Sequence, residues 1–239
     1  MHIFYENEDF LLINKESGLA VHEADSLKEP SLVERLSALR PEQNRLFRCG
    51  LIHRLDKATS GLLLVAKNED FLQELQELFA QRSPLRLYLA LLDRPLREDL
   101  ELECFLKRNE KMRIKQKASR IKDKELLMAR ASTKPELGLR YAKSIFKNID
   151  EEKALIAARL ITGRKHQIRA SLELLGRGIL GDKLYAPRLK AERMMLHSCA
   201  IGFRYKGKNF SHFCSPNFLK DYEDEKLKHC LNDAFGITL

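Results

Sequence analysis

Two side chains that can act together on a substrate lie at Arg54 and Asp56, near the middle of the segment HRLDKATSG (residues 53–61). Residues two positions apart point to the same side of an extended backbone, so the guanidinium and the carboxylate would face one space. A carboxylate held beside a cation can serve as a nucleophile or as an acid or base. The alternative is a structural ion pair, which an isolated Arg-x-Asp usually forms. This segment alone leaves both alternatives open.

The residues that follow Asp56 indicate how it is held. Thr59-Ser60-Gly61 suits a tight bend, and the apolar run LLLVA after it indicates a buried strand. Other apolar runs and alternations favour strands elsewhere in the chain. The predicted strands cover residues 9–15, 61–67 and 85–93, with further strands around 100–106, 140–146 and 153–161.

Capping residues predict the helices. Ser31, with Glu34 three positions later, is typical of a helix start, so we expect a short helix over residues 31–40. Asn68 is expected to cap a second helix, whose apolar stripe would pack into the core. A third helix is predicted over residues 164–175, with Arg169 facing away from its leucines. Because strands and helices alternate without a strict βαβ order, the pattern favours an α+β fold with a mainly antiparallel sheet.

Composition narrows the class of protein. The chain has 239 residues, of which 44% are hydrophobic and 32% are charged, as in ordinary globular proteins. No apolar run is long enough to span a bilayer, and the acidic N-terminus is unlike a signal peptide. We therefore expect a cytoplasmic protein without membrane contact. Five scattered cysteines, with no Cys-x-x-Cys, argue against a disulfide framework and against a zinc site.

Positive charge points to a polyanionic partner. The formal net charge is +9, and residues 107–124 hold nine basic and two acidic side chains. A solvated helix face would mix the two signs more evenly, so this basic stretch favours contact with nucleic acid. The alternative is a disordered basic loop. The side chains predicted to contact RNA here are Lys111, Arg113, Lys115 and Lys117.

Three blocks of the sequence together resemble the RluA-type pseudouridine synthases. The first is HRLDKATSG (residues 53–61), which resembles the family signature His-Arg-Leu-Asp-x-x-Thr-Ser-Gly. The second is TGRKHQIR (residues 162–169), with the Gly-Asp-x-x-Tyr of residues 181–185 downstream. The third is RLYLALL (residues 86–92), similar to the family's Lys-x-Tyr-x-Ala strand. In order and spacing the resemblance extends over roughly residues 8–218.

The resemblance implies a role for each matching residue. Asp56 matches the catalytic aspartate, which acts as a nucleophile or as a base at the ribose. Tyr88 matches the tyrosine that lines the base and helps to remove the proton from C5, and Arg169 matches the basic residue that pairs with the aspartate. Arg54 matches the arginine that enters the space left by the flipped base. The other residues predicted to contact RNA are His53, Arg164 and His166, and for both histidines core packing is the alternative.

The resemblance also implies the fold and the activity. We expect a pseudouridine synthase fold, with a central mixed, mainly antiparallel sheet, flanking helices and a cleft across the middle. The expected activity is isomerisation of specific uridines in ribosomal or transfer RNA, with base flipping and without a cofactor or metal. We expect a single catalytic domain over residues 1–239, no N-terminal S4-type RNA-binding domain, and a monomer.

Two other functions fit part of the sequence. A non-catalytic RNA-binding or ribosome-assembly factor would explain the basic stretch, but it would not need Asp56, Tyr88 and Arg169 together. A glycosidase acting on free nucleosides would use the carboxylate, but it would not need the basic stretch, and such enzymes usually employ two carboxylates. The combination of the three motifs therefore favours the RNA-uridine isomerase.

Overall fold

The computed structural model describes residues 2–23, 27–121 and 138–239. These residues form two compact units. Unit 1 comprises residues 1–85, 196–228 and 238–239, and unit 2 comprises residues 86–195 and 229–237. Lys122 and Lys124 of the predicted basic stretch lie outside the described residues. The single domain over residues 1–239 stays a prediction.

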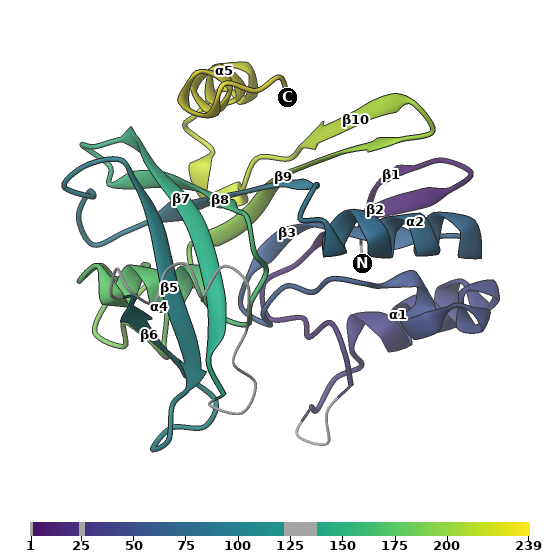
Figure 1. The fold of residues 1–239 in the computed structure, drawn as a ribbon, viewed down its shortest axis with the longest axis horizontal. Helices are drawn as coiled ribbons and strands as arrows, with labels where there is room; N and C mark the ends of the chain where they lie inside the picture. Colours follow the sequence, from purple (N-terminus) through teal and green to yellow (C-terminus); the bar gives the residue numbers. More distant parts are fainter. Residues whose placement is uncertain (1, 24–26, 122–137) are drawn as a thin grey trace. The chain divides into compact units, whose positions relative to one another are not determined.

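The described strands of unit 1 pair in the order β1-β2-β3-β9, with β10 on β9 (Figure 1). All of these pairs are antiparallel except β3 with β9, which run parallel. The sheet is therefore mixed but mainly antiparallel, as predicted. Its strands are β1 (His2–Glu6), β2 (Phe10–Lys15), β3 (Ser60–Ala66), β9 (Leu196–Tyr205) and β10 (Lys208–Phe213).

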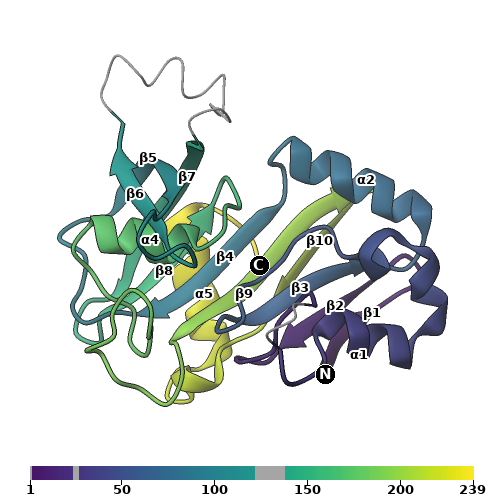
Figure 2. The same cartoon turned by 90° about the horizontal axis from the view of Figure 1, so that it is seen from below.

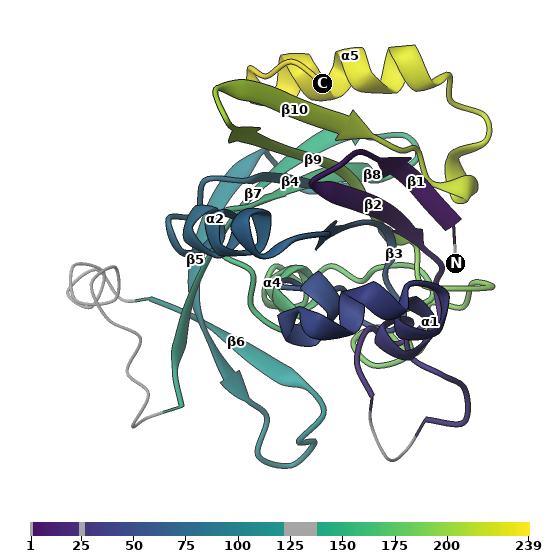
Figure 3. The same cartoon turned by 90° about the vertical axis from the view of Figure 1, so that its right-hand side faces the viewer.

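The described strands of unit 2 follow the order β4-β8-β7-β5-β6, and all of them pair antiparallel. Strands β5 and β6 form a long hairpin (Figure 3), which carries most of the described part of the basic stretch. The predicted strands are confirmed, and β6 is an addition to them. The strands are β4 (Leu85–Leu91), β5 (Leu100–Arg108), β6 (Gln116–Arg120), β7 (Arg140–Asp150) and β8 (Leu155–Leu160).

Two of the predicted helix starts are confirmed down to the capping hydrogen bond. Ser31 accepts the amide of Glu34, whose carboxylate accepts the Ser31 amide at 2.7 Å. The side chain of Asn68 accepts the Phe71 amide at 2.9 Å. The helices are α1 (Leu32–Leu39), α2 (Glu69–Ala80), α4 (Gln167–Leu174) and α5 (Asp224–Phe235), with shorter 3-10 turns at Pro41–Arg45, Phe47–Gly50 and Asn217–Leu219.

The third helix begins later than predicted. Helix α4 starts at Gln167 rather than at residue 164, because His166 adopts a left-handed conformation with φ of 56°. Six of its eight residues are buried, including Arg169. The helix packs against β5 and β6 (Figure 2), so it has no broad solvent face. The residues before it are left as a turn that can carry side chains into a site.

The core of unit 1 holds strand β3 in place. The predicted stripe of α2 packs through Phe71 and Leu75 onto one face of the sheet, where Phe10 and Phe203 complete an aromatic cluster. All seven residues of β3 are buried, as its apolar sequence predicted. Residues 53–59, which precede β3, are therefore attached to a strand that cannot shift without disrupting this core.

Gly61 lies opposite Ser198 where β3 and β9 pair, and the two backbones are close together there. A Cβ atom there would lie 2.3 Å from the carbonyl oxygen of Ser198, and the φ angle is 111°. Only glycine fits such a position without moving one strand. Gly207, in the turn between β9 and β10, shares a positive φ of 75° but has open space around it.

We predict that Gly61→Ala lowers the free energy of unfolding by about 2–5 kcal/mol, from backbone strain and steric overlap combined. Gly207→Ala is the matched control and should cost only about 1–2 kcal/mol, because it adds strain without overlap. Urea denaturation of both variants measures the difference. Equal losses would contradict the close approach of β3 and β9.

Candidate functional site

Asp56 lies in an extended segment just before β3. Arg54 is exposed, Leu55 is buried and Asp56 is half-buried, as expected for side chains that alternate along an extended chain. The Asp56 carbonyl accepts the amide of Thr59 at 3.0 Å and closes a turn over residues 56–59. This turn is earlier than the bend predicted at residues 59–61, because Ser60 and Gly61 already belong to β3. The carboxylate is thus presented from a turn whose far end is fixed by the buried strand.

A buried lysine holds this turn from the other side. Lys15 is only 1% exposed, and its ammonium donates to the carbonyls of Glu16, Leu19 and Lys57. Ser17 Oγ donates to the carbonyl of Ala58 at 2.7 Å, and the Gly18 amide donates to Lys57. These bonds tie residues 16–19 to the turn after Asp56. Lys15 is therefore a positioning residue that sequence analysis missed.

Further positive charge gathers near Arg54 in unit 1. Burial lowers the pKa of His22, and the charges of Arg54 and Arg48 lower it further. Arg48 and Cys49 both have left-handed φ angles, of 50° and 52°. Arg48 lies 4.9 Å from the ring centre of Phe47, an exposed aromatic side chain. Non-glycine residues in this conformation store strain and tend to occur at functional sites.

His53, the first residue of the signature, is used for packing. Its Nε2 accepts the amide of Leu64 at 2.9 Å, and its ring stacks on Phe79 with centroids 5.0 Å apart. These contacts attach the start of the signature to β3 and α2. They favour core packing, one of the two alternatives for His53.

The centre of the site in unit 2 is a buried ion pair between Arg169 and Asp182. Arg169 donates through Nε and Nη2 to the two carboxylate oxygens, at 2.7 and 2.8 Å. The Asp182 side chain is fully buried and also accepts the amides of Leu184 and Tyr185. Burial raises the pKa of Asp182, but the hydrogen bonds and charge of Arg169, with the two amides, outweigh it and hold the pKa below its usual value.

The predicted partner of Arg169 was Asp56, and that pairing stays a prediction. Asp182 is a partner that sequence analysis missed, although it lies in the Gly-Asp-x-x-Tyr block. The bidentate geometry occupies one edge of the planar guanidinium and fixes its plane. It directs Nη1 away from Asp182 and so orients the group for further contacts.

The turn before α4 is built by two side chains of the TGRKHQIR block. Gln167 Oε1 accepts from Thr162 Oγ1 at 2.8 Å and from the Arg164 amide at 2.9 Å, and its Nε2 donates to Lys143. Gly163 leaves room for Arg86, since a Cβ there would lie 2.5 Å from that guanidinium. The spacing of this block therefore reflects a hydrogen-bonded turn rather than a helical face.

Tyr185 links this turn, the ion pair and the β5–β6 hairpin. Its hydroxyl accepts the Gln116 amide at 2.7 Å, lies 3.0 Å from the Gln116 carbonyl and lies 3.2 Å from His166 Nδ1. Arg169 and Lys115 each lie over its ring, 4.9 and 4.6 Å from the centroid. Cation–π contacts of this kind are strongest where water is excluded. Tyr185 is, after Lys15 and Asp182, a third residue that sequence analysis did not single out.

The other predicted residues of unit 2 lie on its strands and turns. Tyr88 is buried in β4, on the same face as Arg86 two residues earlier. Lys115 is partly buried and forms an ion pair with Glu173, so it serves the packing around Tyr185. Exposed side chains remain around the tip of the hairpin, namely Lys111, Arg113 and Lys117. Arg164 donates through Nε to the Tyr141 carbonyl.

Comparison with known proteins identifies the family. A family model described as RNA pseudouridylate synthase matches residues 9–174. An uncharacterized RNA pseudouridine synthase of Helicobacter pylori strain J99 is 40% identical over 216 residues, which cover 86% of this chain and 62% of that protein. The ribosomal large subunit pseudouridine synthase C of Escherichia coli K12 is 31% identical, over 96% of this chain and 68% of that protein.

Solved structures agree with this on the fold. The human RNA pseudouridylate synthase domain containing 4 superposes with a TM-score of 0.69 at 22% identity, and covers 97% of this chain and 93% of that one. The chain belongs to the RNA pseudouridylate synthase family and has its α+β fold, which confirms the RluA-type resemblance. It spans about three-fifths of the length of the Helicobacter pylori relative.

Within the described residues, no helix is long and apolar enough to cross a membrane. The same part of the chain has no group of three or more His, Cys, Asp or Glu side chains placed to hold a metal ion. The five cysteines are free thiols, of which three are buried and two are half-buried.

We predict that Asp182→Asn lowers the free energy of unfolding by about 3–5 kcal/mol, because it leaves the buried Arg169 charge without its counter-ion. Glu110→Gln is the control: it removes the partner of Lys107 from an exposed pair and should cost no more than about 1 kcal/mol. Urea denaturation at neutral pH measures both. A loss in Asp182→Asn as small as the control's would mean that the pair contributes little.

The same pair predicts a dependence on pH. Because the folded-state pKa of Asp182 lies below its unfolded value, its stabilisation is present above the unfolded pKa of about 4. It is lost as the pH falls through the folded-state pKa. The stability difference between wild type and Asp182→Asn should therefore be constant between about pH 5 and 7 and shrink below about pH 4. A difference that grows on acidification would contradict a lowered pKa.

Proposed function

We propose that this protein isomerises specific uridines in structured RNA to pseudouridine. In this reaction the bond between N1 and C1′ breaks, the base turns, and C5 bonds to C1′ in its place. The C5 proton leaves and N1 gains a proton, so no redox step is needed. The observation that carries the proposal is the family match over residues 9–174, which includes the blocks around Asp56, Tyr88 and Arg169.

In this proposal Asp56 acts on the ribose or base as a nucleophile or a base, after the target nucleotide has been flipped out of its stack. Arg169 holds that carboxylate ionised, and its buried pair with Asp182 keeps the guanidinium plane fixed. Tyr88 lines the base and assists the loss of the C5 proton. Arg54, which is exposed beside Asp56, enters the space that the base leaves.

The RNA is proposed to lie along basic side chains of unit 2. His166 and Arg164 precede Arg169, while Lys111, Arg113 and Lys117 extend the path along the hairpin. Contacts to phosphates set affinity and register, whereas the flipped base sets the chemistry. We place the reaction in the cytoplasm, with a monomer as the active form. Ribosomal RNA is our first candidate substrate because a relative is named for the ribosomal large subunit, and transfer RNA is the second.

We predict that Asp56→Asn abolishes pseudouridine formation while leaving the fold and most RNA affinity intact, because the amide is nearly isosteric but cannot act as a nucleophile or base. Asp70→Asn, on the exposed side of α2, is the control and should retain full activity. Cells that lack the gene are complemented with the wild-type gene or with either variant, and the pseudouridines in their RNA are mapped. Restoration of the missing pseudouridine by Asp56→Asn would rule out the catalytic assignment.

A further inference from the structure

Unit 2 contains a basic pocket that the proposed chemistry does not use. Its volume is about 630 Å³, within the range of pockets that bind small molecules. Four cationic side chains of the described residues line it, from the end of β5, the start of β7 and the turn before α4. They are Arg108, Arg140, Arg164 and Lys165.

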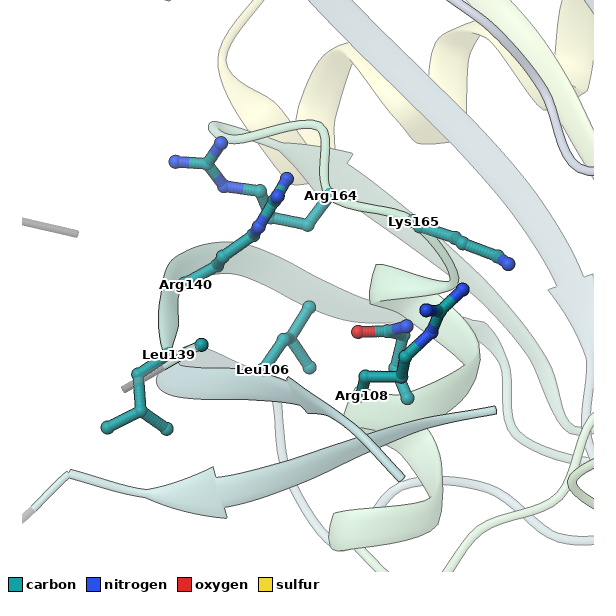
Figure 4. Close-up of a pocket in the computed structure, with 8 residues that line it drawn as sticks. Leu106, Arg108, Leu139, Arg140, Arg164 and Lys165 are labelled. Carbon is teal, nitrogen blue, oxygen red and sulfur yellow. The ribbon is translucent and has the colours of Figure 1, made fainter. Parts of the chain in front are cut away.

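The cations form two pairs, on opposite sides of the pocket. Figure 4 shows Arg140 beside Arg164 on one side of the pocket and Arg108 beside Lys165 on the other, with Leu106 between them. Leu106 lies between the cations but is only 1% exposed, and Leu139 packs against Phe105 and Tyr141 on the opposite face of the sheet. The pocket therefore offers a ligand mainly cationic groups.

The electrostatics favour an anion. Among the lining residues that the structure describes there is no carboxylate. Like charges gathered in one pocket repel each other, and a bound anion relieves that repulsion. Arginine binds phosphate oxygens through paired N–H groups, and its planar face stacks on nucleobases. Phosphate esters of an unstacked nucleotide match both properties.

The pocket adjoins the site around Arg169. Gln116 lines the pocket, and its backbone is hydrogen-bonded to the Tyr185 hydroxyl at 2.7 and 3.0 Å. Arg169 lies over the ring of the same tyrosine. Asp56, Tyr88 and Arg169 are absent from the described lining, so the pocket is not the place where the target uridine reacts. A ligand here would lie next to the reacting nucleotide.

We propose that this pocket binds a second nucleotide of the RNA substrate, unstacked from its neighbours, with its base stacked on the plane of an arginine guanidinium. Its flanking phosphates lie on the two cation pairs. The inference rests on the proposed function, because it assigns part of the same RNA to the pocket. It makes the pocket a determinant of which uridine is chosen, since the RNA must present an extractable nucleotide at a fixed distance from the target.

The first test removes charge from the pocket. The probe is RNA from cells that lack the gene. Its affinity for wild type and for a triple variant is measured at a series of salt concentrations. The triple variant carries Arg108→Gln, Arg140→Gln and Lys165→Gln. The matched control is Lys208→Gln, Lys220→Gln and Lys226→Gln, which loses the same charge from exposed positions of unit 1. Affinity decreases with salt, and the steepness of log affinity against log salt should be smaller by about 2 in the pocket variant. This is about 0.7 for each of the three phosphate contacts removed. The steepness should stay at the wild-type value in the control.

A second, single variant tests the pocket in case the triple variant does not fold. Gln116→Glu is nearly isosteric and places one carboxylate in the pocket, whereas Gln76→Glu makes the same change on the exposed side of α2. We expect Gln116→Glu to weaken RNA binding several-fold and to raise the KM for RNA more than it lowers kcat. Gln76→Glu should leave affinity and activity unchanged. Thermal unfolding verifies that all variants fold.

The outcomes separate the pocket from the reaction. If wild type forms pseudouridine but both pocket variants bind RNA as their controls do, the pocket inference is overturned and the proposed function stands. If wild type forms none in the same RNA, the proposed function fails. Uridine 5′-monophosphate could instead raise the thermal stability of wild type but not of the pocket variants, while wild type and the pocket variants bind RNA equally well. The ligand would then be a free nucleotide, and the RNA inference would be overturned.

Discussion

The buried ion pair between Arg169 and Asp182 is the interaction on which the site of unit 2 depends. Burying two charges costs free energy, and only good geometry and further hydrogen bonds repay it. Here the pair is bidentate and the carboxylate also accepts two backbone amides. Those amides belong to Leu184 and Tyr185, so the pair shapes the loop that carries the tyrosine. Through Tyr185 it also fixes the start of β6, next to the turn of the β5–β6 hairpin.

Much of the fold follows from local sequence. The capping residues Ser31 and Asn68 form the predicted hydrogen bonds, because a cap depends on atoms only three residues apart. Strand β3 was predictable from its apolar run, since a fully buried strand needs no alternation. The start of α4 was not, because Gln167 bonds to Thr162 and Lys143 and holds His166 in a left-handed conformation. That geometry depends on β7, which is distant in sequence.

The candidate site was predictable in its residue types but not in its partners. The family motifs named Asp56, Tyr88 and Arg169, and the role of each stays a proposal. Asp182 could have been suspected, because an aspartate in a Gly-Asp-x-x-Tyr block downstream of an arginine is a natural counter-ion. Lys15 gave no such signal, since a lysine at the end of an apolar strand usually reaches solvent. The basic pocket also escaped notice, because its four cations come from three separate segments of the chain.

The most direct test of the central claim follows the hydrogen on C5 of uridine. RNA labelled with tritium at C5 is made in cells that lack the gene and is then incubated with the purified protein. Formation of the C5–C1′ bond expels that hydrogen into water, so the account predicts tritium release that matches the number of new pseudouridines. Binding of the RNA without any release of tritium would contradict it and leave the protein as an RNA-binding factor.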